Sequence, residues 1–349
     1  MPLSFGRKKK ESVPAVSATA APPKPTVTFD RDAQGWPALV EARQMLAAGD
    51  WRAVHERHAD TADWDFVAGL TRIAGEMPGF PEEWVTACPG QFLPHMLRGR
   101  WRIKHAWDIR GSGQADTVGR DAWPAFHEML NLAEEDLFTA AKASAQSPAP
   151  WSQLLVSGTG LGVPQEERMR RFTESNKRAK GFQDTYAHAI MATTEKWGGS
   201  HETMFDIART ALTKLPAGSP GRIAVLCAHE ERRLYYAAWE KDATAAKEYY
   251  KQPDVVADVA SAAKKSIHSP SYTETASSRA LRGYFAYSLA FTGDAAPEHR
   301  LQAADLFDEI GDDAIPPVPW SSRFGAKAGG EEYARIRALC RNARTSSQS

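Results

Sequence analysis

The chain is organised around one central stretch, Glu195-Lys196-Trp197-Gly198-Gly199-Ser200-His201-Glu202. Upstream of it, apolar residues recur at spacings of three and four, which places them on one helical face. The two glycines can adopt the left-handed conformation that ends a helix, and Ser200 fits the N-cap of the next helix. Apolar residues recur at helical spacing again from Met204 to Leu215. The stretch therefore predicts a tight helix–turn–helix corner beside a large aromatic side chain, Trp197.

Two uses of this corner follow from its residues. In the structural one, Trp197 packs the corner and the glycines make the turn. In the functional one, Trp197, Ser200, His201 and Glu202 line a binding surface. The Ser-His-Glu run does not predict a catalytic triad, because neighbours on a helix point about 100° apart and a triad needs converging side chains.

Length and composition place the chain among soluble globular proteins. It has 349 residues, of which 42% are hydrophobic and 25% charged, enough for one large domain or two ordinary ones. The formal net charge is zero, from 43 basic and 43 acidic residues. A neutral chain has no bulk attraction to nucleic acid or to an anionic membrane, which leaves only local patches of charge for such contacts, and we expect no nucleic-acid partner.

The cysteines and the N-terminus indicate a compartment. Cys88, Cys227 and Cys340 lie far apart and form no CxxC pair, which is typical of a reducing environment. No run approaches the roughly 18 apolar residues of a membrane span. The basic cluster Arg7 to Lys10 is not followed by the apolar core of a signal peptide. These features predict a cytoplasmic protein without a membrane span.

The chain divides into three parts. Residues 1–34, rich in Pro, Ala, Ser, Thr and Lys, predict a disordered basic tail, and residues 344–349 predict a polar tail. Residues 35–343 read as helices separated by Pro, Gly, Asp and Ser, with no period-two alternation. A proline-rich loop is expected over 311–330, and a helix break near Pro124. The expected helices cover residues 36–48, 51–59, 61–76, 82–87, 91–110, 117–145, 151–158, 165–178, 186–197, 204–215, 220–239, 243–250, 255–267, 273–291, 298–310 and 331–342.

So many short helices with small turns predict stacked helix pairs and not a single bundle. The segment from Gly283 to Asp294, followed by Ala303-Ala304-Asp305-Leu306-Phe307, resembles a tetratricopeptide unit, and the turn from Ala47 to Trp51 is similar. The spacing is longer than that repeat, and no strict 34-residue period runs through the chain. The expected fold is an all-α, tetratricopeptide-like solenoid of stacked antiparallel helix pairs.

Two motifs add a family resemblance. Trp107-Asp108-Ile109-Arg110-Gly111, together with the run from Lys196 to Met204, resembles an uncharacterised bacterial family of helical-repeat proteins, a domain of unknown function. The resemblance covers roughly residues 50–310. It implies a fold type and a bacterial source, and it brings no activity or catalytic residue with it.

No named chemistry emerges from the remaining motifs. The histidines form no HExxH or HxH pattern, and His55 and His58 share a helical face without a third ligand. The glycine-rich run Ser157 to Gly162 follows no strand and lacks Gly-Lys-Ser/Thr, so it indicates a helix-ending loop and not a phosphate loop. The basic residues of Arg98 to Arg110 flank an apolar seam and predict a solvated helix. We expect no metal, no cofactor and no assigned catalytic residue.

The most favoured function is a protein–protein interaction scaffold or adaptor that offers a concave helical surface to an unidentified protein or peptide. The candidate interaction surface comprises Trp107, Asp108, Arg110, Lys196, Trp197, Ser200, His201 and Glu202. The alternative is an enzyme or small-molecule binder with a pocket between helix pairs, which would use His188, His201, Glu202 or Asp108. The sequence leaves open the oligomeric state and whether the helices form one superhelix or two lobes.

Overall fold

The computed structural model describes residues 27–111 and 118–348. Within these ranges the chain forms seventeen α-helices and no β-strand, with a single isolated bridge between Phe29 and Ile315. The prediction of an all-helical protein is therefore confirmed. None of the helices described here is long and apolar enough to cross a membrane. The basic cluster Arg7 to Lys10 and most of the expected disordered tail lie outside the described residues.

In chain order the α-helices are α1 (Pro37–Ala47), α2 (Trp51–His58), α3 (Trp64–Glu76), α4 (Glu82–Ala87), α5 (Phe92–Arg110), α6 (Ala122–Ala143), α7 (Ala149–Gly160), α8 (Gln165–Arg178), α9 (Gln183–Ala192), α10 (His201–Lys214), α11 (Ile223–Ala238), α12 (Ala243–Glu248), α13 (Pro253–Lys265), α14 (Ser278–Thr292), α15 (Pro297–Ile310), α16 (Trp320–Phe324) and α17 (Ala326–Gln348). Among the described residues three short 3-10 turns lie between these helices: η2 (Glu195–Trp197), η3 (Pro220–Arg222) and η4 (Tyr249–Lys251).

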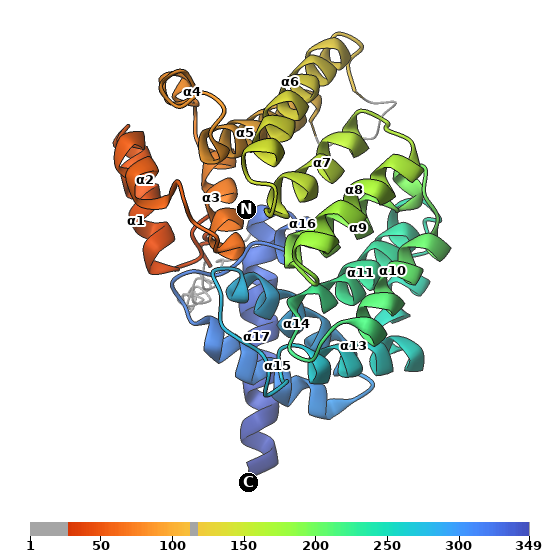
Figure 1. Ribbon diagram of the computed structural model, residues 1–349. Coiled ribbons are helices and arrows are strands. Elements are labelled where there is room, and N and C mark those ends of the chain that lie inside the picture. Colours follow the sequence, from red (N-terminus) through yellow and green to blue (C-terminus); the bar gives the residue numbers. More distant parts are fainter. Residues whose placement is uncertain (1–26, 112–117, 349) are drawn as a thin grey trace, which may run out of the picture.

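Consecutive helices pack side by side, and helices two apart also touch. Thus α5 packs on α6 and α14 on α15, while α3 contacts α5, α7 contacts α9, and α9 contacts α11. Figure 1 shows the result as an arc of helices that runs from α1 and α2 through α5 and α6 to α10 and α13. We call α3, α5, α7, α9 and α11 the inner helices; each contacts the next member of this set.

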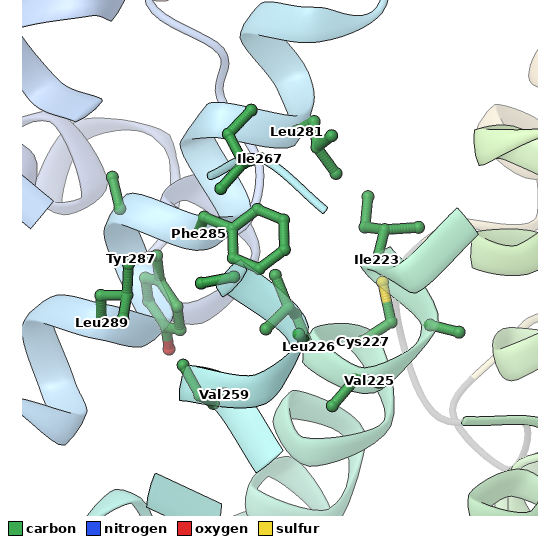
Figure 2. Close-up of a cluster of buried hydrophobic side chains, with 14 of the residues drawn as sticks. Ile223, Val225, Leu226, Cys227, Val259, Ile267, Leu281, Phe285, Tyr287 and Leu289 are labelled. Carbon is green, nitrogen blue, oxygen red and sulfur yellow. The ribbon is translucent and has the colours of Figure 1, made fainter. Parts of the chain in front are cut away.

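The buried side chains form two hydrophobic clusters that meet within α7. One cluster holds residues from Ala33 to Leu154, and the other holds residues from Leu155 to Cys340. Figure 2 shows the second cluster, where Ile223 and Leu226 of α11 face Leu281 and Phe285 of α14. Ala276 crosses this division, since it packs into the first cluster from the loop before α14. The two halves are therefore joined by shared packing.

Residues 27–34, which the sequence places in the predicted tail, contact the helical body. The backbone N–H of Asp30 donates to the carbonyl of Ile315 at 3.0 Å. The Arg279 guanidinium donates to the Gln34 carbonyl at 3.2 Å. Ala33 is fully buried. The first described residues thus pack against α14 and the segment before α16.

The central corner differs from the prediction in where its first helix ends. The pattern predicted a helix as far as Trp197, but α9 ends at Ala192 and Trp197 closes the 3-10 turn η2. The backbone N–H of Ser200 donates to the carbonyl of Thr193 at 3.0 Å, which turns the chain back on itself. Gly198 is left-handed, with φ +75°, and Ser200 caps α10 by accepting from the Thr203 N–H. The predicted glycine and N-cap roles are confirmed.

Four further stretches of helix differ from the prediction. The expected loop over 311–330 contains α16 and the start of α17, because Trp320 is buried completely and fixes a helical turn there. Helix α6 is unbroken. Pro124 lies in its first turn, where backbone N–H groups have no partner within the helix, so the missing N–H of proline costs no hydrogen bond. Helix α7 runs to Gly160, so the glycine-rich run is largely helical, and α17 carries the helix through the expected polar tail to Gln348.

Candidate functional site

Three tryptophans surround one arginine at the edge where α5, α7 and α9 end. The Cζ atom of Arg110 lies 5.4 Å from the ring centroid of Trp107, 5.6 Å from Trp123 and 5.7 Å from Trp197. The rings of Trp107 and Trp197 meet edge to face at 5.4 Å. All four side chains are half-buried. We call these four residues the aromatic corner.

Each member of the aromatic corner is placed by a different segment. Trp107 and Arg110 occupy the last turn of α5, Trp123 lies in the first turn of α6, and Trp197 ends η2. Gly160, at the end of α7, makes room for them. A methyl group at that position would lie 2.5 Å from Leu130 Cδ1 and 3.3 Å from Trp107 Cζ2, too close for the packing to stay as it is.

The buried side chain of Arg168 holds the turn that carries Trp197 in place by hydrogen bonds. Arg168 of α8 is 5% exposed, and its guanidinium donates to the carbonyls of Ala192 and Trp197, the latter at 3.0 Å. It therefore satisfies the last carbonyl of α9 and the last carbonyl of η2 together. Burial lowers the pKa of Arg168 from its usual value. The turn that carries Trp197 is thus held by charge-assisted hydrogen bonds.

The other polar residues of the central stretch turn toward α11. Lys196 pairs with Glu231 at 2.6 Å, with both side chains less than a fifth exposed. His201 Nε2 accepts a hydrogen bond from the Arg232 guanidinium at 2.5 Å, and the His201 ring lies edge-on to the ring of Tyr235. Burial, together with the charge of Arg232, lowers the pKa of His201. These contacts tie the corner to α11 and leave Lys196 and His201 outside the aromatic corner.

Two predicted site residues lie at the surface and do not join the others. Asp108 is exposed and pairs with Lys104 of the same helix at 2.7 Å. Glu202 is exposed in the first turn of α10. The structure thus brings together Trp107, Arg110 and Trp197 of the eight predicted residues. Trp123 joins them and is not among the eight predicted residues.

The basic stretch from Arg98 to Arg110 is divided among three places. Arg98 and Arg102 both contact the carboxylate of Asp136, which is 2% exposed, at 2.7–2.9 Å. Arg110 lies in the aromatic corner, and Arg100 faces the inner helix α3. The predicted solvated helix is therefore wrong for Arg98 and Arg102, which form a buried ion-pair network between α5 and α6.

Charged side chains also gather on the inner helices, away from the aromatic corner. They come from α3, α5 and α9, and each is half-buried. We call this set the charged wall; it comprises Asp65, Arg72, Arg100, Asp184 and His188. The carboxylate of Asp184 lies close enough to the other four to shift the pKa of each.

Burial dominates the electrostatics of the charged wall. It raises the pKa of Asp65 to about 6 and lowers the pKa of both Arg72 and Arg100. Burial likewise lowers the pKa of His188, whose Nδ1 atom lies 2.9 Å from the Ser152 hydroxyl. These shifts mean that water is withdrawn from the charges. No sequence motif indicated this set, because its members are spread over more than a hundred residues and share no spacing.

The predicted alternative pocket does not assemble at the corner. His188 lies in the charged wall, His201 contacts α11, and Asp108 and Glu202 are exposed, so the four side chains do not converge. Within the described ranges no group of three or more His, Cys, Asp or Glu side chains is arranged to hold a metal ion. His55 instead accepts from the indole N–H of Trp84 and contacts Cys88.

Comparison with known proteins identifies no relative: the chain matches no family model, no curated protein and no solved structure. The resemblance to a bacterial helical-repeat family therefore stays a prediction.

Proposed function

We propose that the chain is a protein–protein interaction scaffold, a tetratricopeptide-like solenoid in the cytoplasm whose protein or peptide partner docks at the aromatic corner. The observation that carries the proposal is the convergence of Trp107, Trp123 and Trp197 on Arg110 while all four keep partial exposure. Tryptophan and arginine are the residues most enriched at the energetic centres of protein interfaces.

The rigidity of the corner supports this role. Its side chains are fixed by helix ends, by the close packing at Gly160 and by the hydrogen bonds from Arg168, so a partner would meet a preformed surface. Apolar surface continues beside it. Ile109, next to Arg110, and Met191, at the end of α9, are each 40% exposed.

The test is affinity capture from the lysate of the native host with the intact chain, the Trp197→Ala variant and the Trp239→Ala variant. Trp239 is 42% exposed and stacks on Tyr235 of α11, not on a ring of the aromatic corner, so it serves as the matched control. We expect a stoichiometric protein that is captured by the intact chain and by Trp239→Ala and lost from Trp197→Ala. Circular dichroism must show that the Trp197 variant is folded.

A partner retained by folded Trp197→Ala would contradict the proposal. A partner lost only when residues 1–34 are deleted would assign the interaction to the N-terminal segment.

A further inference from the structure

Three interhelix loops surround an open cleft at the start of α5. The loops join α2 to α3, α4 to α5 and α6 to α7, and the cleft between them has a volume of about 490 Å³. Small-molecule pockets range from about 300 to 1,000 Å³, so this space fits a small ligand. We call it the loop cleft. The side chains with polar groups that line it are Asp60, Thr61, Trp64, Gln91, Ser144 and Gln146.

The loop cleft combines one aromatic side chain with polar groups that have no partner in the protein. Trp64 is half-buried, and its ring meets that of Phe92 edge to face with the centroids 6.1 Å apart. The indole N–H of Trp64 donates to no other group among the described residues. Within the same residues, four further side chains of the cleft make no hydrogen bond: Asp60, Gln91, Ser144 and Gln146. All of these groups are therefore available to a ligand.

The charges at the loop cleft disfavour both a simple anion and a simple cation. Among the described residues no Lys, Arg or His lines the cleft, and Asp60 is the one acidic side chain that does. The positive end of the α5 dipole also lies there, because Phe92 begins that helix and lines the cleft. No side chain caps the first turn of α5, which leaves backbone N–H groups to donate. An anion would meet Asp60, and a cation would meet the N-terminus of α5.

We propose that the loop cleft binds a neutral sugar, as a monosaccharide or as the end of an oligosaccharide. A sugar hydroxyl both donates and accepts, so it can pair with the Asp60 carboxylate, which only accepts, and with N–H groups, which only donate. The C–H face of the sugar ring would pack on the indole of Trp64, which has an apolar ring and a polar N–H. A flat nucleobase presents its donors and acceptors in one plane, whereas the polar groups here come from three loops around the cleft.

The loop cleft is distant from the aromatic corner, so it can be tested whether or not the proposed scaffold function holds. Gln91 precedes α5 and Arg110 ends it, and the 19 residues of this helix span about 27 Å. Saturation-transfer NMR on the full chain tests glucose, galactose, mannose, N-acetylglucosamine, cellobiose and maltose, and calorimetry titrates the strongest of them. Adenosine, choline and inorganic phosphate are tested beside them as a flat base, a cation and an anion.

We expect at least one of these sugars to bind with a dissociation constant on the order of 1 mM. Asp60→Ala and Gln146→Ala should each weaken it about three- to tenfold, because hydrogen bonds to hydroxyl groups are lost. Trp64→Leu should weaken it about tenfold or more, because the aromatic face is lost. Glu56→Ala is the matched control, since Glu56 is an exposed acid of α2 that does not line the cleft. It and Trp197→Ala should bind as the intact chain does.

Three results would overturn the proposal: no binding of any of the six sugars, sugar binding that Asp60→Ala and Gln146→Ala leave unchanged, and tighter binding of adenosine, choline or phosphate than of every sugar. Circular dichroism checks that each variant is folded. Asp60 and Gln146 are exposed, so their replacement should leave the fold intact. These two variants therefore decide the question even if Trp64→Leu, which alters packing against Phe92, does not fold.

Discussion

The rings of Trp107 and Trp197 meet at 77° with their centroids 5.4 Å apart, although one closes α5 and the other follows α9. This edge-to-face contact joins the ends of two inner helices across the end of α7. This contact brings together the two motifs noted in the sequence, Trp107 to Gly111 and Lys196 to Met204.

The contact between these rings should be measurable as a coupling free energy. In a double-mutant cycle of Trp107→Ala and Trp197→Ala, followed by denaturant unfolding, we expect a coupling of about 0.5–1.5 kcal/mol. The same cycle with Trp107→Ala and Trp239→Ala should give none, since Trp239 lies on Tyr235 instead. Additive free energies for the first pair would contradict the contact.

Arg168 should stabilise the fold far more than a surface cation of the same helix. In Arg168→Met the carbonyls of Ala192 and Trp197 lose their donor while they remain buried, which should cost about 2–4 kcal/mol. Lys177→Met, which removes a surface pair with Glu174, should change stability by less than about 1 kcal/mol. Urea unfolding monitored by tryptophan fluorescence measures both, and equal effects would refute the anchoring role.

Asp136 should make the protein sensitive to acid. Burial alone would raise its pKa, but hydrogen bonds from His95 and Arg98 outweigh it and hold the pKa below the usual 3.8. Because the folded pKa is the lower one, this stabilisation is present above about pH 4 and is lost as the pH falls through the folded value. Asp136→Asn should cost about 3–5 kcal/mol at pH 7 and much less near pH 2.

Asp65 should give the opposite dependence of stability on pH. Its pKa in the folded protein is raised from 3.8 to about 6, so the folded state favours the protonated form. The resulting stabilisation is complete below pH 3.8 and disappears as the pH rises through about 6. Asp65→Asn, which mimics the neutral acid, should therefore be more stable than the intact chain at pH 8, by up to about 3 kcal/mol, with little difference at pH 3. Equal effects at both pH values would contradict the raised pKa.

The helices could be predicted from sequence because their signals are local. The periodic apolar residues, Gly198 and the N-cap Ser200 each act within a few residues of their own position. The same reasoning failed for α16, because its prolines suggested a loop while the burial of Trp320 depends on distant helices. It also missed the shortened α9, whose end is set by the turn that joins Ser200 to Thr193.

The candidate sites were accessible to sequence reasoning only in part. Trp107 and Trp197 were grouped because each lies in an unusual motif, yet their contact depends on the packing of α5, α7 and α9. The charged wall was not predicted as a set: Arg100 belonged to the basic stretch from Arg98 to Arg110, and His188 was named only for the alternative pocket. Which charged side chains lie near one another depends on the packing of distant segments, and spacing along the chain does not reveal it.

The closure of the arc by residues 27–34 determines how the molecule responds to force. A row of stacked helices with free ends behaves as a spring, because small rotations at each interface add up to a large extension. Here the Asp30–Ile315 and Arg279–Gln34 hydrogen bonds tie the first described residues to α14 and the segment before α16. The segment before α1 is therefore connected directly to α14 and to the segment before α16. Moving the first described residues away from α14 would break both hydrogen bonds.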